Sequence, residues 1–358
     1  MKKTLQKLQW ARAELIALAI GAALYILYRG LIWLCPNWAK AHIAAPLMGA
    51  LGAISDKLPW GITQWVIVAF FVAALGLAVW YVAKIITRRG QRAGYACRLG
   101  AAAVAIVLLV YCGYCYLWGL NYYDKDFAAR EGLTRQPTSA TTLYNACVYF
   151  ANLCNQTACD MPQKQDILQQ AEQIWQQNST MFDTLLPDRH TVKGLPASAL
   201  LSKIGYSGFY FPFTGEANVN THMPATDLPC TALHELAHKS GVAAEDEANF
   251  VAIVLCLNSQ NSAFVYSGAL TGYTYLINQL YQTDYELWQK AAVINDRVYS
   301  DLMEQVDYWQ EQQSPAEEVA DQVYEGFLQS FSQSEGLNTY SLVVDLLLCN
   351  PEYWQQTN

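Results

Sequence analysis

The sequence predicts a mainly α-helical protein, with three N-terminal transmembrane helices followed by an α+β outer domain that contains a small sheet. Three long apolar stretches precede residue 122. Beyond them the chain becomes acidic and shows helical periodicity, interrupted by one aromatic, strand-like segment. We therefore expect a membrane domain at residues 1–121 and an extracytoplasmic domain at residues 122–358.

The apolar stretches cover residues 15–35, 61–86 and 99–120. Each is long enough to cross the roughly 30 Å hydrocarbon layer of a bilayer as a helix. A cleaved signal peptide is the competing interpretation of the first stretch. That stretch is long, lacks a small-x-small cleavage pattern and is followed by further spans. We expect three spans in contact with membrane lipid.

Basic residues predict the orientation of these spans. The loop between the first two spans has only Lys40 and Lys57, whereas basic residues cluster before the first span and between the second and third: Lys2, Lys3, Lys7, Arg12, Lys84, Arg88, Arg89, Arg92 and Arg98. Because cytoplasmic loops carry the excess of Lys and Arg, the N-terminus should be cytoplasmic. With three spans, the C-terminal domain then lies on the outer face of the membrane.

The outer domain is strongly acidic. After residue 121 there are 28 Asp and Glu residues against 10 Lys and Arg residues. Such a domain repels phosphate backbones, so we expect no nucleic-acid partner. Six of the ten cysteines fall here, a number that permits disulfides without requiring them, and Cys154 and Cys159 could close a small loop.

Helical patterns fill most of the outer domain, at residues 138–157, 163–177, 262–280, 285–312 and 315–332. The last two are amphipathic, and we expect them to pack over the site described next. Residues 341–349 form an apolar run too short for a fourth span. Residues 205–220 have strand composition, broken at Pro212 and Gly215.

The most informative motif is His234-Glu235-Leu236-Ala237-His238. Two histidines four positions apart on a helix project from one face, so both imidazoles can reach a single tetrahedral ion. Glu235 lies beside the pair, where its carboxylate can act as general base on an activated water. Ser240-Gly241 is a helix stop just past the motif. This pattern predicts a Zn²⁺ site at His234 and His238.

A third ligand is expected from the acidic start of the next helix, Glu245-Asp246-Glu247. An alternative interpretation is that these acids only favour the positive end of a helix dipole. Two satisfied, partly buried histidines are likewise the alternative for the motif itself. That interpretation requires the intervening Glu235 and the acids downstream to be coincidental.

The motif followed by Glu245-x-x-Ala248-Asn249 resembles the gluzincin metallopeptidases. The resemblance implies that Glu245 is the third zinc ligand, with Asn249 as its companion on the same helix face. Glu247 stays open as the alternative ligand, because the sequence does not fix where the second helix starts.

A longer stretch, from Tyr210-Phe211-Pro212-Phe213-Thr214-Gly215-Glu216-Ala217-Asn218-Val219-Asn220 through both motifs, is similar to a bacterial family catalogued as domain of unknown function 3810. The resemblance is strong over residues 207–252 and loose elsewhere. It implies a membrane-anchored zinc peptidase with a zincin-like outer domain, and it supplies no substrate.

In the peptidases that this site resembles, an exposed strand upstream of the zinc helix pairs with the substrate backbone. Residues 215–220 are in the right place for that edge, and Glu216 and Asn218 would then address the substrate. An ordinary hairpin with solvent-facing polar residues is the equal alternative. His222, after this strand, is expected to be a loop residue.

Catalysis would also need a donor for the oxyanion of the attacked amide. No histidine follows His238, so the candidates are Tyr266, Tyr273, Tyr275 and Arg297. Arg297 could equally make a structural ion pair.

Together these features predict a zinc-dependent metallopeptidase that acts on a peptide or protein substrate. A zinc-stabilised binding or scaffold protein without turnover is the main alternative. An intramembrane protease would need its histidine motif inside a spanning helix, and the motif here lies more than a hundred residues past the last span.

Overall fold

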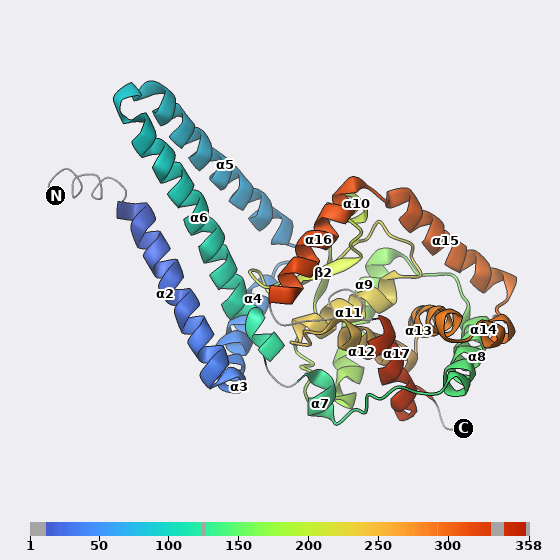
Figure 1. Cartoon of the computed structure of the whole chain (residues 1–358). Coiled ribbons are helices and arrows are strands. Elements are labelled where there is room, and N and C mark those ends of the chain that lie inside the picture. Colours follow the sequence, from blue (N-terminus) through green and yellow to red (C-terminus); the bar gives the residue numbers. More distant parts are fainter. Residues whose placement is uncertain (1–11, 124–125, 292, 331–339, 356–358) are drawn as a thin grey trace. The chain divides into compact units, whose positions relative to one another are not determined.

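The computed structural model describes residues 12–123, 126–291, 293–330 and 340–355 (Figure 1). The chain divides into two compact units, and the division is not a single cut in the sequence. Unit 1 contains the described residues of 1–51 and 62–124 together with Pro212–Thr214. Unit 2 contains Gly52–Gly61 and the described residues of 125–211 and 215–358.

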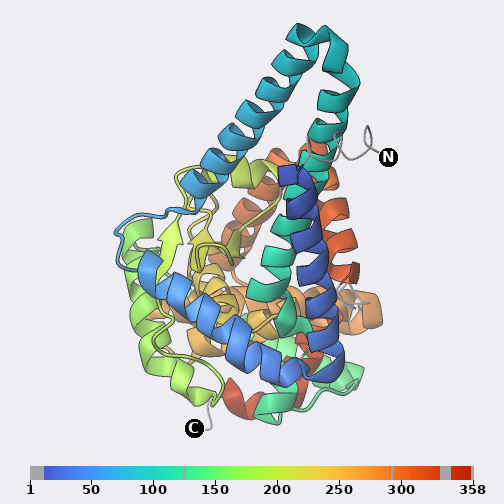
Figure 2. The ribbon, with the colours of Figure 1, turned by 90° about the vertical axis from the view of Figure 1, so that its left-hand side faces the viewer.

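Unit 1 contains three helices that are long and apolar enough to cross a membrane, which confirms the predicted number. They are α2 (Arg12–Leu34), α5 (Thr63–Thr87) and α6 (Arg92–Leu117), with the shorter α3 (Pro36–Ala39), η1 (Lys40–Ala44), η2 (Arg89–Gln91) and η3 (Gly119–Tyr123) at their ends. The third helix begins seven residues before the expected stretch. Helix α6 packs against both α2 and α5, and Figure 2 shows α5 and α6 as an antiparallel pair.

A buried polar cluster joins the three long helices of unit 1. Arg98 on α6 donates to the Glu14 carboxylate on α2 at 2.8 Å, and Tyr81 on α5 donates to the same oxygen. The guanidinium also lies over the Tyr81 ring, 5.7 Å from its centroid. Separating the helices would leave the Glu14 and Arg98 charges unpaired among apolar side chains, which is costly. The shared hydrogen bonds therefore hold the three helices in fixed positions relative to one another.

Helix α4 (Ala45–Ser55) runs from unit 1 into unit 2, so its last turn and the loop that follows belong to unit 2. The helices confined to unit 2 are α7 (Phe127–Glu131), α8 (Ala140–Thr157), α9 (Lys164–Asn178), α10 (Ser198–Lys203), α11 (Leu228–Lys239), α12 (Glu245–Leu257), α13 (Ser262–Thr283), α14 (Tyr285–Ala291), α15 (Asp296–Gln312), α16 (Pro315–Ser330) and α17 (Tyr340–Cys349), with short 3-10 turns η4 (Ser179–Met181) and η5 (Pro351–Tyr353).

The mainly helical class is confirmed, with one difference of helix division. Residues 285–312, expected as one helix, form α14 and α15. Asn295 accepts the amide hydrogen of Val298 and so starts a new helix there, because a side-chain cap satisfies an otherwise orphaned N–H group.

A three-stranded sheet lies in unit 2, with strand order β1-β3-β2. Strand β1 (Val192–Gly194) runs parallel to β3 (Glu216–Val219), and β2 (Gly208–Phe211) pairs antiparallel with β3, with Gly208 opposite Val219. Gly215 closes the hairpin at φ 70°, a left-handed conformation that glycine adopts without a steric penalty. Strand β3 is therefore central, and the expectation that residues 215–220 form an exposed edge is wrong.

The core of unit 2 is built around α12, which is buried along nearly its whole length. It packs against α11, α13 and α17 (Figure 1). A helix that is apolar on all sides belongs inside a protein, and α12 thereby holds the acidic residues of its first turn in fixed positions beside α11. Helix α17 also contributes buried leucines to this core, in agreement with its exclusion as a fourth span.

Candidate metal centre

Helix α11 brings the two histidines of the motif to one face. Pro229 lies in its first turn, where a missing N–H costs nothing, and nearly the whole helix is buried against the sheet and neighbouring helices. The two imidazole rings are 4.6 Å apart at their centroids and nearly perpendicular, at 87°. Their ring nitrogens can therefore approach one point from two directions.

Helix α12 supplies a carboxylate to that point. The Oε2 atom of Glu245 lies 3.2 Å from His234 Nε2 and 3.4 Å from His238 Nε2. One ligand atom from each of these three residues lies within 4.8 Å of the others, so they could hold a metal ion. The Glu245 side chain is 28% exposed, which leaves one side of the cluster open.

The helix stop after the motif orients His238. Gly241 adopts a left-handed φ of 95°, and the turn places the Val242 carbonyl 2.8 Å from His238 Nδ1. A carbonyl can only accept, so Nδ1 carries a proton, and Nε2, the ring nitrogen nearer to Glu245, is the atom left to bind a metal. Such a hydrogen bond on the far nitrogen is the usual way in which proteins fix the tautomer of a metal-binding histidine.

The electrostatics of the cluster favour a cation. Burial alone would lower the pKa of His238, but the negative charges of Glu245 and Glu235 outweigh it and raise that pKa to about 9. Burial likewise works against the Glu245 carboxylate, yet the neighbouring histidines hold its pKa well below the usual range. The Glu245 carboxylate therefore stays ionised between the two imidazoles, and a positive charge placed among the three side chains would be stabilised.

His234 differs from His238 in its surroundings. Burial lowers the pKa of His234, and contacts with Glu245 and Asn249 oppose that lowering. Asn249, expected as a companion of Glu245, thus lies beside the His234 ring.

Glu235 lies next to the cluster with a buried carboxylate. Its side chain is only 3% exposed, and burial raises its pKa to about 8. Among the described residues, its Oε2 atom has no hydrogen-bond partner. A buried carboxyl oxygen without a donor is costly when charged, so this group readily accepts a proton.

Glu247, the alternative third ligand, points elsewhere. Its two carboxylate oxygens accept the backbone N–H groups of Phe127 and Ala128, each at 2.9 Å, at the start of α7. Asp246 accepts from Arg135 at 2.5 Å. Of the three consecutive acids, the structure brings only Glu245 to the histidines.

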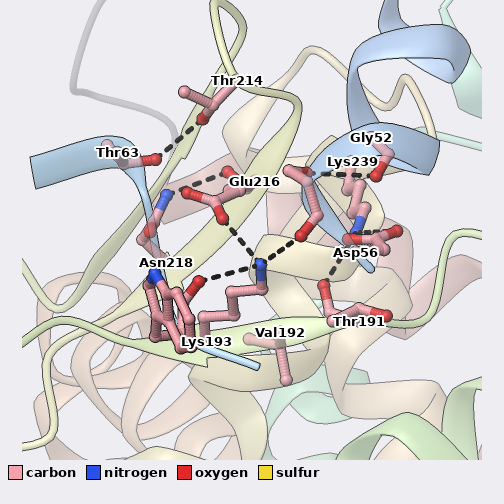
Figure 3. Close-up of polar contacts among 12 residues, drawn as sticks. Gly52, Asp56, Thr63, Thr191, Val192, Lys193, Thr214, Glu216, Asn218 and Lys239 are labelled. Atoms are coloured by element: carbon pink, nitrogen blue, oxygen red, sulfur yellow. Dashed lines mark hydrogen bonds and ion pairs between the residues drawn. The ribbon is translucent and has the colours of Figure 1, made fainter. Parts of the chain in front are cut away.

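Glu216 and Asn218 lie on the central strand and are buried. Glu216 accepts a hydrogen bond from Lys193 of β1 at 2.7 Å, and the Asn218 amide donates to the Glu216 carbonyl at 3.0 Å (Figure 3). The Lys193 contact joins β1 to β3, and the Asn218 contact lies within β3, so both side chains, which had been expected to address a substrate, are engaged in the sheet.

A second buried lysine lies directly after the motif. Lys239 donates to both carboxylate oxygens of Asp56, at 2.7 and 2.9 Å, and to the Thr191 carbonyl at 2.9 Å (Figure 3). Lys193 likewise donates to the Ser55 carbonyl at 2.7 Å. Gly52–Gly61, which comprises the last turn of α4 and the loop after it, is thereby fixed within unit 2. Nothing in the sequence marked it as part of the site's surroundings.

Three of the four side chains considered as oxyanion donors, Tyr266, Tyr273 and Arg297, have other partners or are buried. Tyr266 donates to Asp301 at 2.6 Å, and Arg297 pairs with Asp301 and Asp160, each at 3.0 Å, as in the structural alternative. Tyr273 is buried in the core. Tyr206, just before β2, was not among these candidates. Burial raises its pKa, and the charges of Asp321 and Glu245 add to that rise, so its hydroxyl lies within electrostatic range of Glu245.

Comparison with known proteins identifies the family. A family sequence model described as "Protein of unknown function (DUF3810)" matches residues 42–348. The chain belongs to this family. The match includes two of the three spanning helices and every residue of the candidate metal centre in this DUF3810 chain. No curated protein and no solved structure matches it.

The ten cysteines of the DUF3810 chain all lie in described residues and form no disulfide there. Cys154 and Cys159, expected as a possible loop closure, are both free thiols.

Proposed function

We propose that this chain is a membrane-anchored zinc metallopeptidase of the gluzincin type, which hydrolyses peptide bonds in a peptide or protein substrate. The observation that carries the proposal is the convergence of His234, His238 and Glu245 beside the buried carboxylate of Glu235. Two imidazoles, one carboxylate and one open side are the donor set of a catalytic zinc site.

Each residue has a defined role in this proposal. His234, His238 and Glu245 hold Zn²⁺, which when bound acts as a Lewis acid toward the scissile carbonyl and toward water. Glu235 accepts a proton from the attacking water as its oxygen bonds to the carbonyl carbon. It then gives that proton to the leaving nitrogen as the C–N bond breaks, so the carboxylate ends unchanged.

Substrate would bind along β2, which is an edge strand of the described sheet. Extended peptide can add to such an edge through main-chain hydrogen bonds. The first residue of β2, Gly208, lies directly against Glu235, so a peptide on this edge would pass close to the general base.

The three apolar helices would anchor the enzyme in a bacterial cell membrane, with a cytoplasmic N-terminus and unit 2 outside the cell. Helix α11 is not among the spanning helices of the described chain, which argues against an intramembrane protease.

Glu235→Gln in the full-length protein tests the mechanism. We expect the variant to keep one zinc ion per chain, because Glu235 is not a ligand, and to lose cleavage of a peptide mixture that the wild type digests. A His234→Ala, His238→Ala double variant should lose both zinc and cleavage. Full cleavage by the Gln variant would refute the assigned role of Glu235.

One alternative is a zinc-stabilised scaffold, in which the low exposure of Glu235 and His238 keeps substrate away from the metal. Stoichiometric zinc without turnover of any peptide would favour this alternative.

A further inference from the structure

Gly208, the first residue of edge strand β2, is in unusually close contact with Glu235. A Cβ atom built at Gly208 would lie 2.6 Å from Glu235 Oε1, 2.8 Å from its Cγ and 2.9 Å from the Asn218 carbonyl oxygen. Ordinary contacts of a Cβ atom begin at 3.4 Å. Any side chain at this position would therefore occupy space that the Glu235 carboxylate now fills.

Glycine is needed at position 208 because there is no space for a side chain, and not because the backbone has an unusual conformation. Its φ lies outside the left-handed region, so an alanine could adopt the same strand conformation. Glu235 is almost wholly buried and has little room to move away. A closely packed interior has no free space for an added methyl group, so the neighbouring side chain must move.

We propose that Gly208 is a positioning residue for Glu235: the missing side chain lets the backbone of β2 press against the carboxylate and fix it beside the histidine pair. This inference rests on the proposed peptidase function. Gly208→Ala would displace the carboxylate oxygen by about 0.8 Å, the difference between 3.4 and 2.6 Å. A misplacement of about 1 Å at a catalytic group can lower a rate about a hundredfold.

Gly194 offers a matched control in the same sheet. A Cβ atom there would also meet a side-chain atom at 2.6 Å, in this case Thr221 Cγ2. Gly194→Ala therefore imposes an equally short closest contact on an edge strand, although with fewer atoms, and the side chain that must move is not part of the candidate site.

The kinetic test compares Gly208→Ala and Gly194→Ala with the full-length wild type, using a peptide that the wild type cleaves. We expect kcat to fall about a hundredfold in Gly208→Ala with KM changed less than about threefold. Zinc content should remain at one ion per chain in both variants, and Gly194→Ala should keep kcat within about threefold.

A second test measures the contact without using activity. In thermal unfolding, Gly208→Ala should lower the transition temperature in the wild-type background and cause a much smaller shift in a Glu235→Ala background, where the carboxylate is gone. Gly194→Ala should cause equal shifts in both backgrounds. If Gly208→Ala does not fold alone, recovery of folding in the Glu235→Ala background supports the same contact.

The outcomes separate this inference from the proposed function. Wild-type protein that binds zinc and cleaves no peptide overturns the proposed function and this inference with it. An active wild type with unchanged kcat in Gly208→Ala, or equal thermal shifts for that variant in both backgrounds, overturns the positioning role alone.

Discussion

Asp56→Ala should strongly destabilise unit 2, although Asp56 lies between two membrane-spanning helices in the sequence. Lys239 is 1% exposed, and three hydrogen bonds satisfy its ammonium group, two of them to Asp56. The third goes to the Thr191 carbonyl. The substitution leaves a buried cation with one neutral acceptor.

The expected loss of stability in Asp56→Ala follows from the burial of the Lys239–Asp56 ion pair. Removing one partner of a buried ion pair costs about 3–5 kcal/mol, because the remaining charge is stranded. The Asp56 side chain is 20% exposed, so water can partly replace it, and we expect about 2–3 kcal/mol. Burial also lowers the pKa of Lys239, with Asp56 opposing, so loss of Asp56 favours the neutral amine and limits the cost.

Hydrogen exchange of α11 amides in the full-length protein in detergent measures this loss, because the amides report the free energy of opening of unit 2. Asp160→Ala is the control. The Asp160 side chain is 95% exposed and its partner Arg297 is 49% exposed, so loss of this ion pair should cost less than about 1 kcal/mol of stability. Lys239→Met combined with Asp56→Ala should recover most of the stability, since no charge is left buried.

The reasoning about this pair is refuted if Asp56→Ala reduces α11 protection no more than Asp160→Ala does. The same contacts predict that a fragment starting at residue 122 is less stable than unit 2 within the whole chain, because it lacks Gly52–Gly61.

Three further predictions concern the site and its surroundings. Glu245→Gln should weaken zinc affinity at least about a hundredfold, whereas Glu247→Gln should leave zinc content unchanged and reduce amide protection in α7; zinc loss in the second variant would contradict the ligand assignment. Tyr206→Phe should lower kcat about a hundredfold with little effect on KM if its hydroxyl stabilises the oxyanion, and an unchanged kcat would exclude that role. Asp227→Asn should alter the pH dependence of stability. Burial raises the pKa of Asp227 from 3.8 to about 7, so the folded state binds this proton more tightly than the unfolded state. Its contribution is complete below about pH 4 and is lost as pH rises through 7; denaturant titrations should show the Asn variant gaining about 4 kcal/mol relative to wild type over that range, and parallel pH profiles would contradict this.

The sequence alone determined the features that depend on local periodicity. The three spans follow from uninterrupted apolar length, and the pairing of His234 with His238 follows from the 3.6-residue turn of any helix. The mainly helical class of unit 2 also follows from local patterns, including the helix stop at Gly241 that places the Val242 carbonyl behind His238.

Tertiary structure decided which residues those local elements bring together. Glu245 and Glu247 are two positions apart, about 200° around a helix, so only the observed start of α12 determines which carboxylate faces the histidines. The order of the sheet is equally nonlocal: β1 pairs with β3 from more than twenty residues away, which makes β3 central and leaves β2 as an edge.

Two contacts between distant parts of the chain show most clearly what the sequence could not predict. Lys239 meets Asp56 across 183 positions of sequence, and Gly208 meets Glu235 from a different element. Charge complementarity and close packing act over a few ångströms in space and leave no periodic trace along the chain, so these contacts required the folded structure.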